Sequence, residues 1–124
     1  MKHVALEGSL ELVRKPGYVR VWHGRSARTL EEADAVLNEI DQAMDRWQTY
    51  RLMFDSRDAD RTPADVGARI WSWLSDHPRI ERVATLVQSG ELADSVDLQG
   101  IGNDIRIRSF HAEPAAERWL TMLT

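Results

Sequence analysis

The fold is decided by residues 50–74, YRLMFDSRDADRTPADVGARIWSWL. Within this stretch the spacing of the apolar residues changes from that of a strand to that of a helix. Tyr50 to Asp55 is a short, nearly continuous apolar run, which is typical of a strand covered on both faces. From Thr62 to His77 the apolar residues fall at helical spacing, and Pro78 stands where such a helix should have ended. The stretch is therefore predicted to be a strand followed by a helix, the unit from which parallel sheets are built.

The residues before this unit predict a hairpin and a helix. Two alternating runs, roughly 4–14 and 18–23, are joined by Lys15-Pro16-Gly17-Tyr18, a turn in which proline presets one dihedral and glycine permits a positive φ. Thr29 to Glu32 is a capping box, which starts a helix. The apolar stripe of that helix has spacings of three and four and consists of Leu30, Ala33, Leu37, Ile40, Met44 and Trp47.

The residues after the unit repeat the order of strand and helix. Val83 to Val87 predicts a buried strand, 91–98 a short amphipathic segment, and Ile105 to Phe110 a half-exposed strand near the sheet edge. Pro114 opens a last helix. We therefore expect an α/β fold with a mixed sheet of about five strands, an N-terminal antiparallel hairpin followed by parallel βα units, and about four helices. The expected core consists of Leu37, Ile40, Phe54, Ile70, Val83, Leu86, Ile105, Ile107 and Trp119.

Length and composition narrow the class of protein. A chain of 124 residues is expected to be a single domain, 1–124. It has no cysteine, which excludes thiolate metal sites and is compatible with a reducing cytoplasm. The formal net charge is −4 and the only lysines are Lys2 and Lys15, so no basic stripe for nucleic acid is present. No apolar run approaches the roughly twenty residues of a membrane span, and the start lacks the apolar core of a signal peptide, so we expect no stable membrane insertion.

One motif points to catalysis, but its context does not. Residues 58–62, DADRT, match the D-x-D-x-T phosphatase signature of the haloacid dehalogenase class. In that class the first aspartate of the motif is the nucleophile and lies at the end of a strand, yet here the strand ends at Asp55. Such enzymes also need a lysine further along the chain, and none follows Lys15. Read as a calcium loop from Asp58, the sequence places Pro63 at the glycine position and Arg69 at the bidentate-acid position. We interpret the stretch as a solvated loop in which Thr62 caps the next helix.

Other chemical motifs are equally incomplete. Residues 100–102, GIG, begin like a dinucleotide fingerprint, but Ile105 occupies the third glycine position. The four histidines have no metal-like spacing, and no Ser-His-Asp group can be assembled from the sequence. We therefore expect no enzyme activity, no cofactor and no metal.

The aromatic residues indicate a surface for association. Trp71 and Trp73 lie about 200° apart on one helix, so Trp71 points to the flank, either against a neighbouring helix or at an oligomer or ligand surface. The glycine-flanked segment 90–103 is either an ordinary crossover helix or a flap over an apolar cleft, and its apolar residues are Leu92, Val96, Leu98 and Ile101. We predict a homodimer that uses helix 62–77 or segment 90–103, with Trp71 near its centre.

Three stretches together carry a family resemblance: 50–74, 79–96 (RIERVATLVQSGELADSV) and 103–120 (NDIRIRSFHAEPAAERWL). From about Leu10 to Leu120, the chain resembles the SpoIIAA-like group of STAS-type domains of bacterial proteins. This group is related to anti-sigma-factor antagonists and linked by fold to lipid-carrying Sec14 proteins. The resemblance implies the SpoIIAA-like form of the mixed sheet described above.

The resemblance also implies two kinds of function. In the antagonist branch, a partner kinase phosphorylates a serine at the start of the helix after the third strand. The corresponding place here holds Thr62, without the Asp-Ser-Ser-Gly signature, so Thr62 is a regulatory phosphosite in one reading and a helix cap in the other. The first function is a non-catalytic protein-interaction module that binds a protein partner through its helical face. The alternative is a small carrier or sensor that binds a lipid-like or apolar anionic ligand under 90–103.

Overall fold

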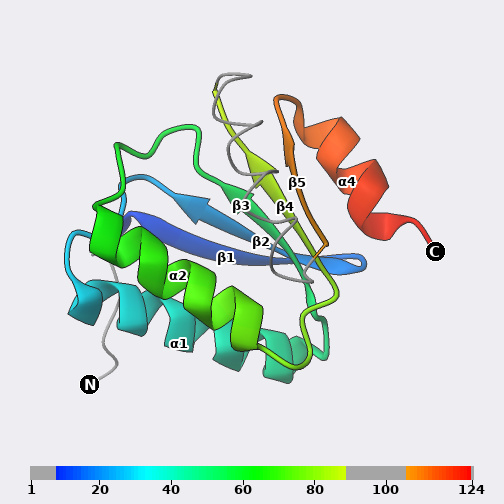
Figure 1. The fold of residues 1–124 in the computed structure, drawn as a ribbon. Coiled ribbons are helices and arrows are strands. Elements are labelled where there is room, and N and C mark those ends of the chain that lie inside the picture. Colours follow the sequence, from blue (N-terminus) through cyan, green and yellow to red (C-terminus); the bar gives the residue numbers. More distant parts are fainter. Residues whose placement is uncertain (1–7, 89–105, 124) are drawn as a thin grey trace.

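The computed structural model of the chain describes residues 8–88 and 106–123. One sheet has the strand order β1-β2-β3-β4-β5, in which β1 and β2 are antiparallel and β2 to β5 are parallel (Figure 1). The strands are β1 (Leu10–Lys15), β2 (Tyr18–His23), β3 (Arg51–Asp55), β4 (Arg82–Leu86) and β5 (Arg106–Phe110). The described part of the chain contains α1 (Leu30–Trp47), α2 (Ala64–Asp76) and α4 (Glu113–Thr121). The predicted mixed sheet is confirmed, and segment 90–103 lies outside the described residues.

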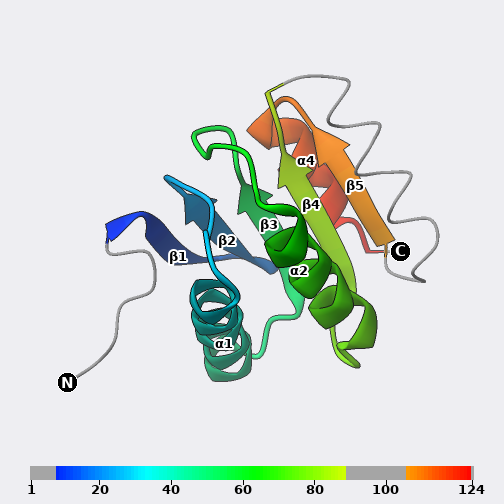
Figure 2. The same ribbon diagram turned by 60° about the vertical axis from the view of Figure 1, so that its left-hand side comes forward.

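The helices form two layers around the sheet. α1 and α2 lie side by side on one face, and α4 lies on the other (Figures 1 and 2). Because successive side chains of a strand point to opposite faces, the sheet supplies two cores. Leu52 and Phe54 belong to the main core under α1 and α2, whereas Met53 belongs to a smaller core under α4.

Most of the expected core is confirmed. The buried members are Leu37, Ile40, Phe54, Val83, Leu86, Ile107 and Trp119. Ile70 is only partly buried at the margin of the main core, and Ile105 lies outside the described residues. None of the described helices is long and apolar enough to span a membrane.

The predicted start of α1 is confirmed in part. The Thr29 hydroxyl accepts a hydrogen bond from the backbone N–H of Glu32 at 3.1 Å, as a capping box requires. The Glu32 carboxylate, however, accepts from the backbone N–H of Arg28 and from the Arg25 guanidinium. Its pKa falls to about 2, chiefly through the hydrogen bonds from Arg25. The second hydrogen bond of the capping box is therefore replaced by contacts of Glu32 with the loop before the helix.

The predicted cap of α2 is wrong. The helix begins at Ala64 and its N-cap is Pro63, which offers no side-chain hydrogen bond. Thr62 stands one residue too early because a residue before proline is biased away from helical conformation. Its hydroxyl lies 3.1 Å from Ser26 Oγ instead, so Thr62 joins two loops and caps no helix.

Candidate functional site

A compact polar cluster lies where β2 and β3 approach α4. Asp55, the last residue of β3, is buried. Its carboxylate accepts from Arg20 Nη2 at 2.6 Å and from Arg57 Nε and Nη2, each at 2.9 Å. Glu113 of α4 accepts from Arg20 Nε and Nη2 at 3.1 Å and lies 3.5 Å from Arg57 Nη2. Two guanidinium groups and two carboxylates thus form one neutral network.

The electrostatics of this network favour a fixed, ionised carboxylate. The side-chain hydrogen bonds from Arg57 hold the pKa of Asp55 below its usual range against the opposing effect of burial. The hydrogen bond to Glu113 raises the pKa of Arg20. A carboxylate stabilised in this way is poorly matched to proton transfer near neutral pH. We therefore assign the cluster to anchoring α4 on the sheet.

A second polar contact anchors the same helix. Tyr18 is fully buried, and its hydroxyl donates to Glu117 Oε2 at 2.5 Å. Burial, followed by the contact with Glu117, raises the pKa of the Tyr18 phenol. Glu113 and Glu117 are four residues apart, so both project from one side of α4 towards β2.

The aspartate-rich loop, predicted to be solvated, makes several contacts with the rest of the protein. Asp60 Oδ1 accepts from the backbone N–H of Ser26 at 2.9 Å, and the Asp60 carbonyl accepts from the Ser26 hydroxyl at 2.6 Å. The backbone hydrogen bond from Ser26 is the main reason that the pKa of Asp60 is lowered. Asp58 remains exposed and accepts from Trp22 Nε1 at 3.0 Å. The loop 56–63 is therefore tied to the loop that follows β2.

The histidines occupy separate environments. His23 stacks on Phe54, with ring centroids 5.7 Å apart, and burial lowers its pKa to about 4. His77 is the C-cap residue of α2, and its Nε2 contacts Asp41 Oδ1 at 2.7 Å. Within 8–88 and 106–123, no group of three or more His, Cys, Asp or Glu residues is arranged to hold a metal ion.

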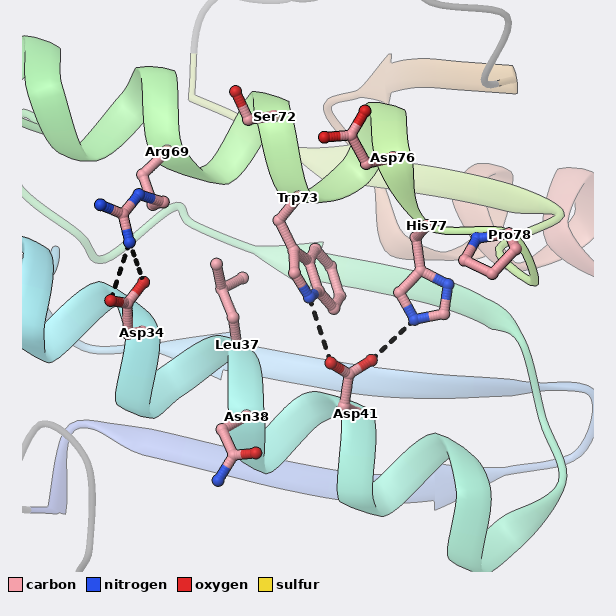
Figure 3. A pocket seen from close by; sticks show the side chains of 10 residues that line it. All are labelled: Asp34, Leu37, Asn38, Asp41, Arg69, Ser72, Trp73, Asp76, His77 and Pro78. Carbon is pink, nitrogen blue, oxygen red and sulfur yellow. Dashed lines mark hydrogen bonds and ion pairs between the residues drawn. The ribbon is translucent and has the colours of Figure 1, made fainter.

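A groove of about 600 Å³ runs between α1 and α2 (Figure 3). Arg69 Nη1 bridges it at one end, at 2.6 and 2.8 Å from the two carboxylate oxygens of Asp34. At the other end Asp41 accepts from Trp73 Nε1 at 3.2 Å and contacts His77. The lining residues are Asp34, Leu37, Asn38, Asp41, Arg69, Ser72, Trp73, Asp76, His77 and Pro78.

Charge distinguishes this groove from the rest of the molecule. α1 and α2 together carry eight acidic residues and two arginines, a formal charge of −6 in a chain whose total is −4. The Asp34 and Asp41 side chains remain 55% and 40% exposed although each is already paired. In Figure 3, Asp76 and Ser72 point outward from α2, and Asn38 points outward from α1. The groove therefore has an apolar floor of Leu37 and Trp73 between polar rims with an excess of carboxylates.

The site residues expected from sequence are not brought together by the described structure. Trp71 is half-buried, packs against the main core and does not line the groove. Thr62 is exposed in the loop before α2. The remaining candidates, Leu92, Val96, Leu98 and Ile101, lie outside the described residues. The groove was not predicted from the sequence, although the α1 segment carries acidic residues along one side, at Asp34, Asp41 and Asp45.

Comparison with known proteins fits this description of the fold. No protein-family model matches the chain, and no curated protein matches it. A solved structure that matches is an uncharacterized protein of the DUF3478 family with a SpoIIAA-like fold, from Shewanella loihica PV-4. Its TM-score is 0.71, over 90% of this chain and 91% of that one. This chain has a SpoIIAA-like fold. The sequence identity is 13%, so the SpoIIAA-like resemblance extends to the fold alone.

Proposed function

We propose that this SpoIIAA-like domain is a non-catalytic protein-interaction module of the STAS-like kind, and that the groove between α1 and α2 receives a basic segment of its protein partner. The observation that carries the proposal is the lining of the groove. Asp34 and Asp41 stand on α1 and Asp76 stands on α2, with the apolar Leu37 and Trp73 between them. Binding sites for peptides commonly combine an apolar floor with a few charged groups at the rim.

Charge complementarity identifies the class of partner. The acidic surface of α1 and α2 attracts a lysine- or arginine-bearing segment and repels an acidic one. The carboxylates of Asp34 and Asp41 already accept hydrogen bonds across the groove and retain exposed oxygen surface. They can therefore accept a further hydrogen bond from a guanidinium or ammonium group without breaking the contacts that join the helices.

The two other functional hypotheses stay predictions. A lipid-like anionic ligand is disfavoured in this groove by its carboxylates, and the expected cleft under 90–103 lies outside the described residues. Phosphorylation of Thr62 would act on an exposed hydroxyl that contacts Ser26. Neither hypothesis has a described contact in its favour comparable to the lining of the groove.

An NMR titration of the ¹⁵N-labelled protein tests the proposal. The probe is an amphipathic helical peptide with lysines on its polar face, and its counterpart carries glutamates at the same positions. We expect the lysine peptide to shift the backbone resonances of α1 and α2 around Asp34, Asp41 and Trp73, and the glutamate peptide to leave them unshifted. Equal shifts with both peptides, or shifts confined to other elements, would contradict the proposal.

A matched pair of variants sharpens the same experiment. Asp76→Asn removes one carboxylate from the rim of the groove, whereas Asp65→Asn removes one from the first turn of the same helix, outside the groove. The net charge changes equally in both. We expect Asp76→Asn to weaken the binding of the lysine peptide about threefold or more, and Asp65→Asn to change it much less. The same loss in both variants would indicate attraction without a defined site.

A further inference from the structure

The first strand leaves one edge of the sheet open. β1 pairs with β2 on one side only, and within residues 8–88 and 106–123 no strand pairs with its other edge. Lys15 pairs with Tyr18 across the two-residue turn, so these two residues form the hydrogen-bonded pair that closes the hairpin. Hydrogen-bonded pairs alternate along an antiparallel ladder. Consequently Leu12 and Arg14 direct their backbone N–H and C=O groups to the open edge.

The side chains of β1 show which residues share a face. Residues directly opposite in the ladder lie on the same face, so Val13 accompanies Arg20 and Lys15 accompanies Tyr18 on the side of α4. Glu11 lies on the same side, two residues before Val13. α4 packs on β3, β4 and β5, and β1 is the edge strand at the other end of the sheet from β5. Glu11, Val13 and Lys15 thus form a short row at the rim of the sheet, with opposite charges at its two ends.

We propose that two copies of this chain pair through their β1 strands, antiparallel, about a two-fold axis at Val13. Glu11 of each copy then lies opposite Lys15 of the other, and the interface contains this opposite-charge pair twice. Val13 lies against Val13 of the second copy. Leu12 lies opposite Arg14 of the second copy, so the outward backbone groups of both strands meet and can exchange hydrogen bonds. The two sheets become one continuous sheet.

The charge pattern selects this register over its neighbours. Residues that lie opposite each other in a continuous sheet must point to the same face. The alternative registers between the two β1 strands therefore place the two-fold axis at a neighbouring residue of β1 instead of at Val13. An axis at Glu11 or at Arg14 places two like charges directly opposite each other, which is destabilising. An axis at Leu12 places Glu11 opposite Val13 and forms no opposite-charge pair. Charged residues on an edge strand commonly prevent that strand from pairing with other exposed strands. In the two-fold arrangement with its axis at Val13, the charged residues of β1 instead form opposite-charge pairs between the two copies.

This surface is distinct from both the groove and Trp71. The inference therefore stands independently of the proposed function, and it places the dimer predicted from sequence at another part of the fold. The Trp71→Ala variant separates the two interfaces, because Trp71 belongs to α2. The β1 interface predicts that this variant associates like the wild type.

Sedimentation equilibrium across the micromolar range tests the inference with a charge swap. The wild type is expected to be a dimer that dissociates on dilution. Lys15→Glu and Glu11→Lys each replace two opposite-charge pairs with two like-charge pairs, so each is expected to weaken dimerisation about tenfold or more. The double variant Glu11→Lys/Lys15→Glu restores both pairs with reversed signs and is expected to dimerise like the wild type. Glu31→Lys, an exposed charge reversal on α1, is the control and should leave the dimer intact.

Three results would overturn the inference. They are a wild type that stays monomeric throughout the micromolar range, a double variant that fails to recover association, and a Trp71→Ala variant that dissociates while Lys15→Glu does not. Thermal melts of each variant, followed by circular dichroism, establish that loss of association is not loss of fold.

Discussion

Arg57 holds both carboxylate oxygens of Asp55, through Nε to Oδ1 and Nη2 to Oδ2, each at 2.9 Å. Arg57 is only two residues after Asp55, the last residue of β3. The Asp55 carboxylate is buried, and it also contacts a side chain from another strand. Arg20 of β2 reaches the same carboxylate, and Glu113 of α4 contacts both arginines. This network fixes α4 against the sheet.

Removal of the central carboxylate should destabilise the fold. Asp55→Asn leaves Arg20 and Arg57 without the charge that both contact, and we expect the free energy of unfolding to fall by about 2–3 kcal/mol. This loss is at or below the lower end of the roughly 3–5 kcal/mol for broken buried pairs, because the Arg57 and Glu113 side chains are 36% and 35% exposed. Urea denaturation measures the loss. Asp58→Asn in the neighbouring loop is the control and should cost less than about 0.5 kcal/mol. Equal stability of the two variants would contradict the structural role of Asp55.

The same carboxylate gives a prediction for pH. The folded-state pKa of Asp55 is depressed, so its contribution is fully present above the unfolded-state pKa of about 3.9 and is lost as the pH falls through the lower folded value. The difference in melting temperature between wild type and Asp55→Asn should therefore be constant above about pH 5 and become smaller below about pH 4. A difference that grows on acidification would contradict the assigned direction of the shift.

The loop contacts predict that Ser26 contributes more to stability than Thr62 does. Ser26 is buried, and its hydroxyl donates to the Asp60 carbonyl at 2.6 Å, so Ser26→Ala should cost about 1–2 kcal/mol. Thr62 is exposed and caps no helix, so Thr62→Ala should cost less than about 0.5 kcal/mol. Chemical denaturation of the two variants side by side measures the ranking. A larger loss of unfolding free energy in Thr62→Ala than in Ser26→Ala would instead support the helix cap predicted from the sequence.

The hydroxyl of Tyr18 provides a test of how α4 is anchored. Tyr18→Phe keeps the buried ring and removes the hydrogen bond to Glu117, which should lower the free energy of unfolding by about 1 kcal/mol. Glu117→Gln keeps an acceptor oxygen and should cost less. A double-mutant cycle gives the coupling between the two side chains. Additive losses would mean that the contact contributes nothing to stability.

Local patterns predicted the elements of this fold, whereas contacts between distant residues determined its sites. The apolar run 50–55 and the stripe from Leu30 to Trp47 each carry their own period, so β3 and α1 could be located from sequence. The Thr62 prediction failed because proline moved the start of the helix and Ser26, from another loop, contacts the hydroxyl.

The polar cluster and the groove show the same limit more clearly. The partner Arg20 lies 35 residues before Asp55. Glu113, on the helix that covers this face of the sheet, lies 93 residues after Arg20. No short window of sequence contains these residues together. The groove likewise depends on the spacing between α1 and α2, since Asp41 meets Trp73 and His77 only when the two helices pack side by side.

The most direct measurement for the proposed function is a charge swap on the rims of the groove. One variant combines Asn38→Lys and Asp76→Lys, which place a positive charge on each rim of the groove. The Asp34–Arg69 and Asp41–His77 pairs remain in this variant. Binding of fluorescently labelled lysine and glutamate peptides is followed by anisotropy. The wild type should prefer the lysine peptide, and the variant should lose that preference by about tenfold or more and gain affinity for the glutamate peptide. An unchanged preference in the variant would show that partners of this domain do not bind between α1 and α2.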